Sequence, residues 1–402
     1  MLPMEHFNSY PDHRMWISNI QLDGFRNYKE LSLDLPQGLV FIHGNNGQGK
    51  SNLLEAIHLL SIFKSLRASR EVELINLDMP RINHNNYALI SADANSDNAL
   101  INIKLMIESH PNELFPTDNK TLVKKKIRVN GTPKKASDAL GIIPSILISP
   151  DDIQLISGSP SLRRRFLDLM ISQVDRRYLD DLRRYLKVLF HRNSLLKSLN
   201  NQSSLYEQLT HWDTQLVKTG VNLLNSRIKA ISFLQDNLTT IFKSLTNEAD
   251  DFSLDYISTV AMLKDQSALE ASFLEKLLAS QGKDITLGST SVGPHRDDIC
   301  LRQNGRNVAT YASRGQARIF TLLMKLGQAM YTEHYHGEQP VLLLDDVLAE
   351  LDDQARTRLI KYTEQYQQVI ITSTNMNIAK PKHQSIFLYL ENGIFRETPY
   401  VL

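Results

Sequence analysis

Residues 44–51, with the sequence GNNGQGKS, combine glycines, a lysine and a serine in the order GxxxxGK[ST]. Glycines at these positions let backbone N–H groups turn toward a phosphate, and the amino terminus of a following helix adds positive potential. We expect Lys50 to reach the terminal phosphates of a nucleotide and the Ser51 hydroxyl to bind Mg²⁺. The predicted phosphate-binding residues are Gly44, Asn45, Asn46, Gly47, Gln48, Gly49, Lys50, Ser51 and Asn52.

Two adjacent aspartates end the apolar stretch VLLLDD at residues 341–346. A carboxylate beside a hydrophobic core is costly unless a cation or a polar reactant accompanies it. Neighbouring residues at a strand end point in different directions, so Asp345 can hold Mg²⁺, directly or through water, while Asp346 faces an attacking water. We therefore predict that Asp345 is a metal ligand and Asp346 the general base. The alternative is a strand that simply ends in acidic turn residues.

Short strands and one long helix must position these residues. LVFIH (39–43) is a buried strand that leads into the glycine-rich loop, and the helix that follows carries apolar residues at helical spacing. VLLLDD and QVIITS (368–373) are apolar runs typical of parallel sheets. Asn-Gly pairs at 130–131 and 304–305 predict two hairpins, although Pro133 weakens the second arm of the first.

Helix-forming residues dominate the middle of the chain, from about 162 to 247 and again at 268–280. Lys50 and Asp345 are therefore separated by an insert of domain size. We predict an α/β fold with a mixed sheet and helices, split into residues 15–158 and 284–402, with a mostly helical lobe at 159–283 and an extension at 1–14. No sustained heptad array is present, so we expect no long coiled coil.

Composition excludes several classes of protein. The 402 residues have a formal net charge of +1, so any nucleic-acid contact must come from a local patch. The single cysteine, Cys300, excludes an intrachain disulfide and a thiolate zinc cluster, which favours a reducing cytoplasm. We expect no membrane-spanning segment, because no apolar run is long enough, and no secretory signal, because the first fourteen residues are too polar.

Several separate motifs resemble the RecF family of ABC-type ATPases, which is related to Rad50 and the SMC proteins. They occur in the family's order, from the LDGFRNYKELSLDL and phosphate-loop region to SPDDIQLISGSPSLRRRFLDLMI (149–171), GSTSVGPHRDDI (288–299) and VLLLDDVLAELDDQARTRL (341–359). The resemblance covers almost the whole chain from Met15. It implies an ABC-type ATPase head that binds ATP and Mg²⁺.

The resemblance also implies a homodimer bridged by ATP. Ser313, Gly315 and Gln316 resemble the signature motif that contacts the terminal phosphate of ATP bound to the opposite protomer. A serine-capped helix amino terminus can bind an anion, although Ser313 alone is equally well explained as an ordinary helix cap. Residues 349–352 match the loop that crosses the dimer interface.

Three residues and one pair of threonines near the nucleotide keep two interpretations each. Gln154 is either the glutamine that links the γ-phosphate to the helical lobe, and so catalytic, or a solvated loop residue. Arg26 and Arg67 either reach the nucleotide or lie on a solvated face. Where related transporters carry a histidine after the next strand, this chain has ITSTN, so either Thr372 or Thr374 takes that position.

Basic residues form two clusters that are candidates for DNA phosphate contacts. The first contains Lys124, Lys125 and Lys126, and the second contains Arg163, Arg164 and Arg165. Such clusters are often only solvated faces. The resemblance nevertheless implies that the ATP-bound dimer binds double-stranded DNA, and no aromatic-rich basic stretch indicates readout of the base sequence.

The implied function is recombinational DNA repair by a weak, DNA-stimulated ATPase. The family resemblance predicts binding near single-strand gaps, where the protein helps RecO and RecR load RecA in place of single-strand-binding protein. One alternative is a Rad50- or SMC-like tether, which the missing coiled coil disfavours. Two further alternatives are a metabolic phosphotransferase and a nuclease fused to such a head. The nuclease is disfavoured, because too few residues follow Asp352 for a second catalytic domain.

Overall fold

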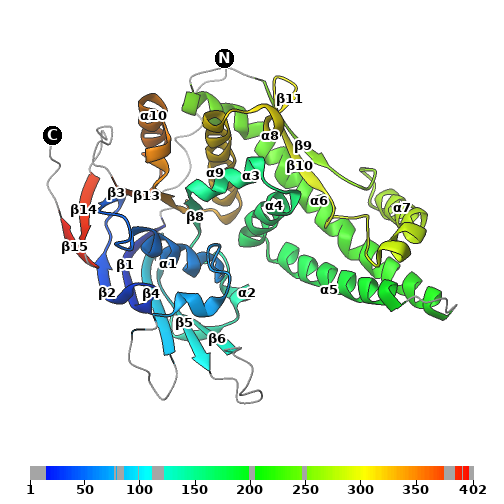
Figure 1. Ribbon diagram of the computed structural model, residues 1–402, viewed down its shortest axis with the longest axis horizontal. Helices are drawn as coiled ribbons and strands as arrows, with labels where there is room; N and C mark the ends of the chain where they lie inside the picture. Colours follow the sequence, from blue (N-terminus) through cyan, green and yellow to red (C-terminus); the bar gives the residue numbers. More distant parts are fainter. Residues whose placement is uncertain are drawn as a thin grey trace. The chain divides into compact units, whose positions relative to one another are not determined.

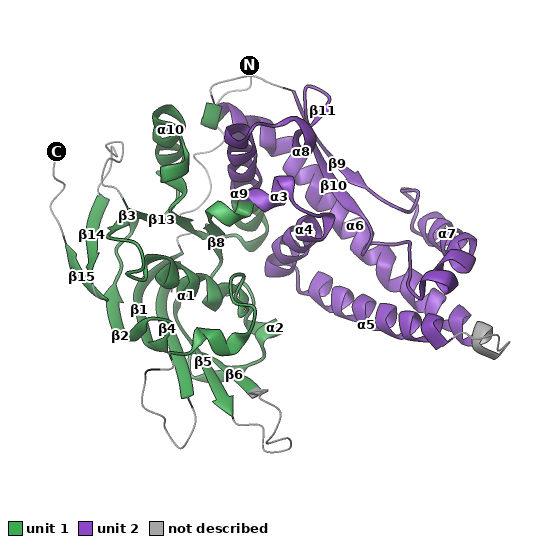
Figure 2. Cartoon of the chain, in the orientation of Figure 1, with its two compact units in different colours: residues 1–152, 244–247, 328–402 green, residues 153–243, 248–327 purple. Residues whose placement is uncertain are grey.

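The computed structural model describes residues 15–76, 78, 86–97, 99–110, 122–198, 204–246, 251–374, 385–391 and 393–397. The chain forms two compact units, shown in green and purple in Figure 2. Unit 1 contains residues 1–152, 244–247 and 328–402, and unit 2 contains residues 153–243 and 248–327. The extension expected at residues 1–14 lies outside the described residues.

One sheet of unit 1 carries the strand ends that hold the candidate site. Its order is β15-β14-β3-β13-β12-β8, and all neighbours are parallel except β14 and β15. The strands are β3 (Gly38–His43), β8 (Ser145–Ile148), β12 (Val341–Asp345), β13 (Gln368–Ser373), β14 (Ser385–Glu391) and β15 (Ile394–Glu397). Because β12 and β13 are buried along their whole length, they require the continuous apolar runs found in the sequence.

The second sheet of unit 1 is antiparallel, in the order β2-β1-β4-β5-β6-β7. Its strands are β1 (Trp16–Phe25), β2 (Tyr28–Asp34), β4 (Asn86–Ser96), β5 (Ala99–His110), β6 (Leu122–Val129) and β7 (Thr132–Lys134). Asn130 and Gly131 both have positive φ, at 48° and 76°, as a tight hairpin between β6 and β7 requires. The predicted hairpin is confirmed, and its second arm, which contains Pro133, is only three residues long.

Helix α1 (Lys50–Ile62) packs against both sheets of unit 1 (Figure 1). Every residue of α1 except Ser51 and Asn52 is buried, so the helix has no solvated face. Leu53 and Ile57 share one core with Ile20 and Ile90 of the antiparallel sheet and with Leu343 of the parallel sheet. The site at the start of α1 is therefore held by the main hydrophobic core of this unit.

Shorter helices complete unit 1. They are the 3₁₀ turns Glu71–Leu74 and Val347–Glu350, together with α2 (Ala136–Ala139) and α10 (Asp353–Thr363), while the 3₁₀ turn Pro150–Ile153 ends at the first residue of unit 2. The predicted α/β fold with a mixed sheet is thereby confirmed. Within the described part of the chain, no helix combines the length and apolar character needed to cross a bilayer.

Unit 2 is mostly helical and contains one small antiparallel sheet in the order β11-β10-β9. Its elements are α3 (Gln154–Ser157), α4 (Pro160–Val174), α5 (Arg176–Ser198), α6 (Ser204–Thr246), β9 (Phe252–Ile257), α7 (Gln266–Leu287), β10 (Asp298–Gln303), β11 (Arg306–Asn307), α8 (Val308–Tyr311) and α9 (Arg314–His336). The last residues of α6 and of α9 belong to unit 1. The second predicted hairpin is also confirmed, with Asn304 and Gly305 at positive φ between β10 and β11.

The unit boundaries differ from those expected from the sequence. Residues 284–327 were expected in the ATPase head but cluster with unit 2, and the first boundary follows Asp152 instead of residue 158. The reason is strand pairing, since β10 pairs along its length with β9. Helix propensity marks where the helical insert begins, but it does not reveal which partner a returning strand will choose.

Buried charges hold residues 288–298 of unit 2 in place. Arg192, which is fully buried, donates to Asp213 at 2.6 Å, to Asp284 at 2.8 Å and to Thr290 at 2.8 Å. Arg227 donates to Asp168 at 2.7 Å, to Pro294 O at 2.6 Å and to the hydroxyls of Tyr178 and Tyr256. Burial raises the pKa of Asp213, and its bond with Arg192 opposes that rise. These ions stabilise the unit only as long as each keeps its partner.

We expect Arg192→Met to lower the free energy of unfolding of this unit by about 3–5 kcal/mol, because two carboxylates then lose the cation that they share. The free energy is measured from urea denaturation followed by circular dichroism and by the fluorescence of Trp212 in α6. Arg184→Met is the matched control. The Arg184 side chain is 72% exposed and lies 3.9 Å from Asp181, so its loss should change the free energy by less than about 0.5 kcal/mol. Equal losses of unfolding free energy in both variants would contradict the stabilising role of the buried Arg192 ion pairs.

Candidate nucleotide-binding site

The glycine-rich loop leaves β3 at the carboxyl edge of the parallel sheet and ends at α1. Two of its glycines are required by their surroundings. A Cβ at Gly44 (φ 154°) would lie 2.3 Å from the Leu390 carbonyl oxygen, and a Cβ at Gly49 (φ 108°) would lie 2.6 Å from the Asn27 amide. Both residues therefore permit a close approach of the backbone to neighbouring groups. Such a loop before a helix can cradle a phosphate with its N–H groups.

Lys50 lies inside this loop. The residue is only 4% exposed, and its ammonium donates to Gly44 O at 2.7 Å and to Asn45 O at 3.0 Å. Burial lowers the pKa of Lys50, while the carboxylates of Asp346 and Asp345 act in the opposite direction. The loop carbonyls and the two aspartates thus place one cation where the sequence predicts phosphate binding.

The turn between β1 and β2 supports the loop from outside. Asn27 Nδ2 donates to Gln48 O at 3.1 Å, and the Tyr28 hydroxyl donates to Gly49 O at 3.0 Å. Asn52 reaches the same turn, because its amide donates to Asn27 Oδ1 at 2.7 Å. Sequence reasoning did not find Asn27 and Tyr28. The only signal was the polar break GFRNYK between two predicted strands, and such breaks are usually simple turns.

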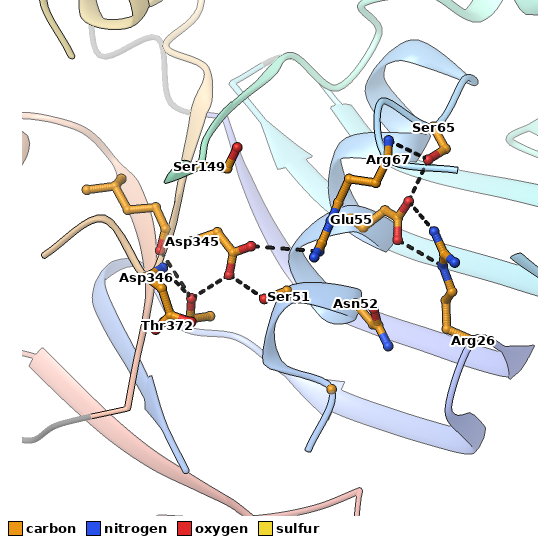
Figure 3. Close-up of polar contacts among 12 residues, drawn as sticks. Arg26, Ser51, Asn52, Glu55, Ser65, Arg67, Ser149, Asp345, Asp346 and Thr372 are labelled. Carbon is orange, nitrogen blue, oxygen red and sulfur yellow. Dashed lines mark hydrogen bonds and ion pairs between the residues drawn. The ribbon is translucent and has the colours of Figure 1, made fainter. Parts of the chain in front are cut away.

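Three oxygen-bearing side chains converge at the end of β12 (Figure 3). Asp345 Oδ1 accepts hydrogen bonds from the Ser51 hydroxyl at 2.7 Å and from the Thr372 hydroxyl at 2.8 Å. Asp345 is 5% exposed, and its second oxygen lies 3.8 Å from the Arg67 guanidinium. A carboxylate and hydroxyls are hard ligands that suit Mg²⁺, which keeps several water and phosphate ligands of its own. Ser51 and Asp345, predicted from distant motifs, are therefore adjacent and fit this metal.

Asp346 has an unusual backbone and an unusual side chain. Its φ is 51°, in the left-handed region, and its N–H donates to Thr372 Oγ1 at 3.0 Å. Its Oδ1 atom is buried and has no hydrogen-bond partner within the part of the chain that the structure describes. Burial raises the pKa of Asp346, Lys50 opposes this shift, and Asp345 adds to it. Backbone strain together with an unsatisfied buried oxygen is typical of a functional carboxylate.

The structure separates the two threonines that sequence reasoning could not distinguish. Thr372 is fully buried, and its hydroxyl bonds to Asp345. Thr374 is exposed after the end of β13. Thr372 is therefore part of the carboxylate cluster, while Thr374 lies outside it. Thr372 lies beside Asp345 on the neighbouring parallel strand. The sequence alone does not show this strand pairing, so it could not single out Thr372.

The residues that resemble the signature motif form a reciprocal helix cap in unit 2. Ser313 N–H donates to Gln316 Oε1 at 2.9 Å, and Gln316 N–H donates to Ser313 Oγ at 3.3 Å, at the start of α9. This is a capping box, and Gly315 has open space around its Cα. The capped end is exposed and presents backbone N–H groups. Gln154, also exposed, begins α3 of the same unit.

The basic clusters differ in how free their charges are. Lys125 is paired with Glu71 and also donates to Phe63 O, and Lys126 donates to Glu108 at 2.8 Å. Lys124 and Lys126 are both exposed on one face of β6.

The three arginines of α4 likewise differ. Arg163 is bound to both oxygens of Asp298, at 2.7 and 2.8 Å, and its side chain is 15% exposed. Arg164 donates to Asp297 O at 2.7 Å, while Arg165 is exposed. In this structure Arg163 joins α4 to β10, so its charge is largely occupied. Arg165 is the member of this cluster that solvent reaches most freely.

Known proteins of one family resemble this chain over nearly its whole length. Residues 16–396 match the family model described as the RecF/RecN/SMC N terminal domain. The chain is 33% identical over 391 residues to the DNA replication and repair protein RecF of Herpetosiphon aurantiacus, covering 94% of this chain and 99% of the relative. It is 35% identical over 363 residues to the same protein of Clostridium novyi, covering 90% and 94%.

Solved structures agree with the sequence relatives. A structure of the recombination mediator protein RecF with ATP, in the RecFOR pathway, matches with a TM-score of 0.84 and 31% identity, over 98% of this chain and 100% of that one. An Smc head domain from Pyrococcus furiosus, at 17% identity and a TM-score of 0.52 over 96% of each chain, shares the fold alone. A family match over residues 16–396 and identities of 33–35% over most of the chain show that the chain belongs to the RecF family within the RecF/RecN/SMC N-terminal domain group.

Proposed function

We propose that this protein is an ATP-dependent DNA-binding ATPase of recombinational repair. The observation that carries the proposal is the hydrogen bond between Ser51 and Asp345, which joins the glycine-rich loop to the acidic strand end beside a buried lysine. Phosphate loop, metal ligands and general base are thereby gathered at one edge of one sheet. Family membership supports the biological setting, because one similar solved structure is that of the recombination mediator protein RecF with ATP in the RecFOR pathway.

Each residue at this edge has a defined task in the proposed reaction. The N–H groups of the loop and the Lys50 ammonium bind the β- and γ-phosphates. Ser51 and Asp345 would hold Mg²⁺, which neutralises charge on the phosphate oxygens. Asp346 orients a water molecule and accepts its proton at the buried Oδ1. Because that oxygen makes no hydrogen bond among the described residues, its acceptor capacity is not used by the protein itself.

ATP also bridges two copies of the chain in this proposal. The capped start of α9, with Ser313, Gly315 and Gln316, contacts the terminal phosphate of ATP held by the partner copy. Gln154 links the same phosphate to the helical unit, and the segment 349–352 lies at the interface. ATP then favours the dimer by mass action, and slow hydrolysis, stimulated by DNA, releases it.

DNA is the second ligand. The ATP-bound dimer binds double-stranded DNA near single-strand gaps, where it acts with RecO and RecR to load RecA in place of single-strand-binding protein. Lys124, Lys126 and Arg165 are the exposed members of the basic clusters and supply phosphate contacts. Arg163 and Lys125 are engaged in ion pairs within the protein, so their main role is structural. Arg164 donates to Asp297 O and is half-buried, so it is less available to DNA than Arg165. A Rad50-like tether is disfavoured, because no long coiled coil is present in the described residues.

Lys50→Ala is expected to weaken ATP binding by about 30- to 100-fold, since about 2–3 kcal/mol of charge-assisted bonding is lost. ATP-dependent dimerisation should disappear with it. Binding is measured by titration with ATP and Mg²⁺, and dimerisation by light scattering. Lys29→Ala, an exposed change on β2, is the control and should dimerise as the wild type does. ATP-dependent dimerisation that survives Lys50→Ala would rule out the loop assignment.

Asp346→Asn should slow hydrolysis by about 10²- to 10⁴-fold while ATP binding persists, because only the proton acceptor is removed. The hydrolysis rate is measured in single-turnover experiments. The variant should also remain a dimer on DNA, which light scattering detects. In the wild type, the raised pKa of Asp346 means that the carboxyl takes up its proton at a higher pH than usual. The hydrolysis rate should therefore fall as pH decreases through that pKa and be full above it. Asp236→Asn, an exposed change on α6, is the control, and wild-type turnover in Asp346→Asn would exclude the base role.

The affinity of the ATP-bound dimer for double-stranded DNA should fall steeply with salt. With two to four phosphates neutralised by each protomer, log affinity against log salt has a slope of about −4 to −7. Lys124→Gln should make the slope less negative by about 2, one unit for each protomer. Lys283→Gln, an exposed change on α7, serves as the control and should leave the slope unchanged. A wild-type slope near zero would exclude a phosphate-contacting surface.

A further inference from the structure

Glu55 is a buried carboxylate on α1, one helical turn after Ser51, that the mechanism above does not use (Figure 3). Its side chain is only 4% exposed, yet both oxygens are satisfied. Arg26 donates to Oε2 and to Oε1, each at 3.0 Å, and the Ser65 hydroxyl donates to Oε1 at 2.6 Å. A buried carboxylate is tolerated only with such a complete set of partners, so the three side chains form one unit.

Arg26 connects Glu55 to the turn that supports the phosphate loop. The residue has φ 52°, in the left-handed region, and its N–H donates to Leu74 O at 2.9 Å. Its guanidinium also donates to Glu73 O at 3.1 Å. The next residue, Asn27, holds Gln48 O of the loop. In this structure each of the three guanidinium nitrogens of Arg26 binds a protein oxygen, and 22% of the side chain remains exposed.

Ser65 connects Glu55 to the segment after α1. While donating to Glu55, its hydroxyl oxygen accepts the N–H of Arg67 at 3.0 Å and the N–H of Ala68 at 2.8 Å. Ser65 is buried, so no solvent competes for these bonds. A serine hydroxyl that accepts the N–H groups two and three residues later in the chain fixes a local turn. The backbone of Arg67 is therefore anchored to α1 through one hydroxyl group.

The side chain of Arg67 cannot fix its own position. It is 41% exposed, and its guanidinium lies 3.8 Å from Asp345, a distance at which a partly solvated ion pair contributes little. The backbone anchor must therefore supply most of its placement beside the carboxylate that we assign to Mg²⁺. A cation fixed there would stabilise negative charge that develops on a phosphoryl group.

We propose that Glu55 is a positioning residue that acts through Ser65 and Arg67. By holding Ser65 it keeps the Arg67 guanidinium at Asp345, and by holding Arg26 it keeps the loop-supporting turn against α1. The effect of Glu55 on ATP hydrolysis rests on the proposed function, whereas its anchoring of residues 65–68 does not. For a change that removes only the link through Ser65, the proposal predicts an effect on kcat with little effect on ATP affinity, because Arg26, the loop and Lys50 keep their contacts.

Ser65→Ala is the sharpest test, because it cuts the link to Arg67 and leaves the Arg26–Glu55 pair in place. Hydrogen exchange of the Arg67 and Ala68 amides should accelerate on the order of tenfold, with or without nucleotide. Single-turnover hydrolysis should slow by about 3- to 10-fold at an unchanged dissociation constant for ATP. Glu55→Gln should change exchange and hydrolysis in the same direction. Ser32→Ala, an exposed change on β2, is the control for both measurements.

A double-mutant cycle separates positioning from general stability. If Ser65 acts through Arg67, then Ser65→Ala combined with Arg67→Ala hydrolyses ATP no more slowly than Arg67→Ala alone. Effects that multiply, or unchanged amide exchange in Ser65→Ala, would overturn the proposal. Wild-type protein that hydrolyses no ATP would instead refute the proposed function, and the exchange measurement would still decide whether Glu55 anchors the Arg67 segment.

Discussion

A single hydrogen bond between Ser51 and Asp345 joins two segments that lie near opposite ends of the chain. It exists because β3 and β12 run parallel in one sheet, with β13 between them, so that their carboxyl ends meet at the same edge. Everything proposed for the site depends on that edge. Thr372 donates to the same carboxylate, whose charge also acts on Lys50 and Asp346, and local structure alone could not have brought these groups together.

Burial of charged groups costs free energy at this site, and the partners that compensate for it also make the site rigid. Helix α1 packs against two sheets and is buried except at Ser51 and Asn52, so the charged groups that it carries, Lys50 and Glu55, must find partners inside the protein. Lys50 finds loop carbonyls, and Glu55 finds Arg26 and Ser65. Each partner in turn belongs to a segment that borders the site. The requirement to satisfy buried charge therefore also aligns the glycine-rich loop, the β1–β2 turn and the segment around Arg67.

The same principle organises unit 2 with different residues. Arg192 and Arg227 are almost completely buried and draw α4, α5, α6, α7 and the segment 288–298 together through carboxylates and carbonyl groups. Arg163, predicted as a DNA contact, is committed to Asp298 in this way. A run of arginines in a sequence thus contains members with opposite tasks, and their solvent exposure separates structural arginines from those free to meet a phosphate.

By itself the sequence determined the phosphate loop, the paired aspartates, both Asn-Gly hairpins and the α/β class, because each depends on local backbone needs or on a short apolar period. Only the tertiary structure decided that Asn27, Tyr28 and Thr372 join the site, that β10 pairs with β9, and that Arg26 binds Glu55. These outcomes depend on which distant segments pack together, and a buried polar group has no signature in the sequence until its partner is known.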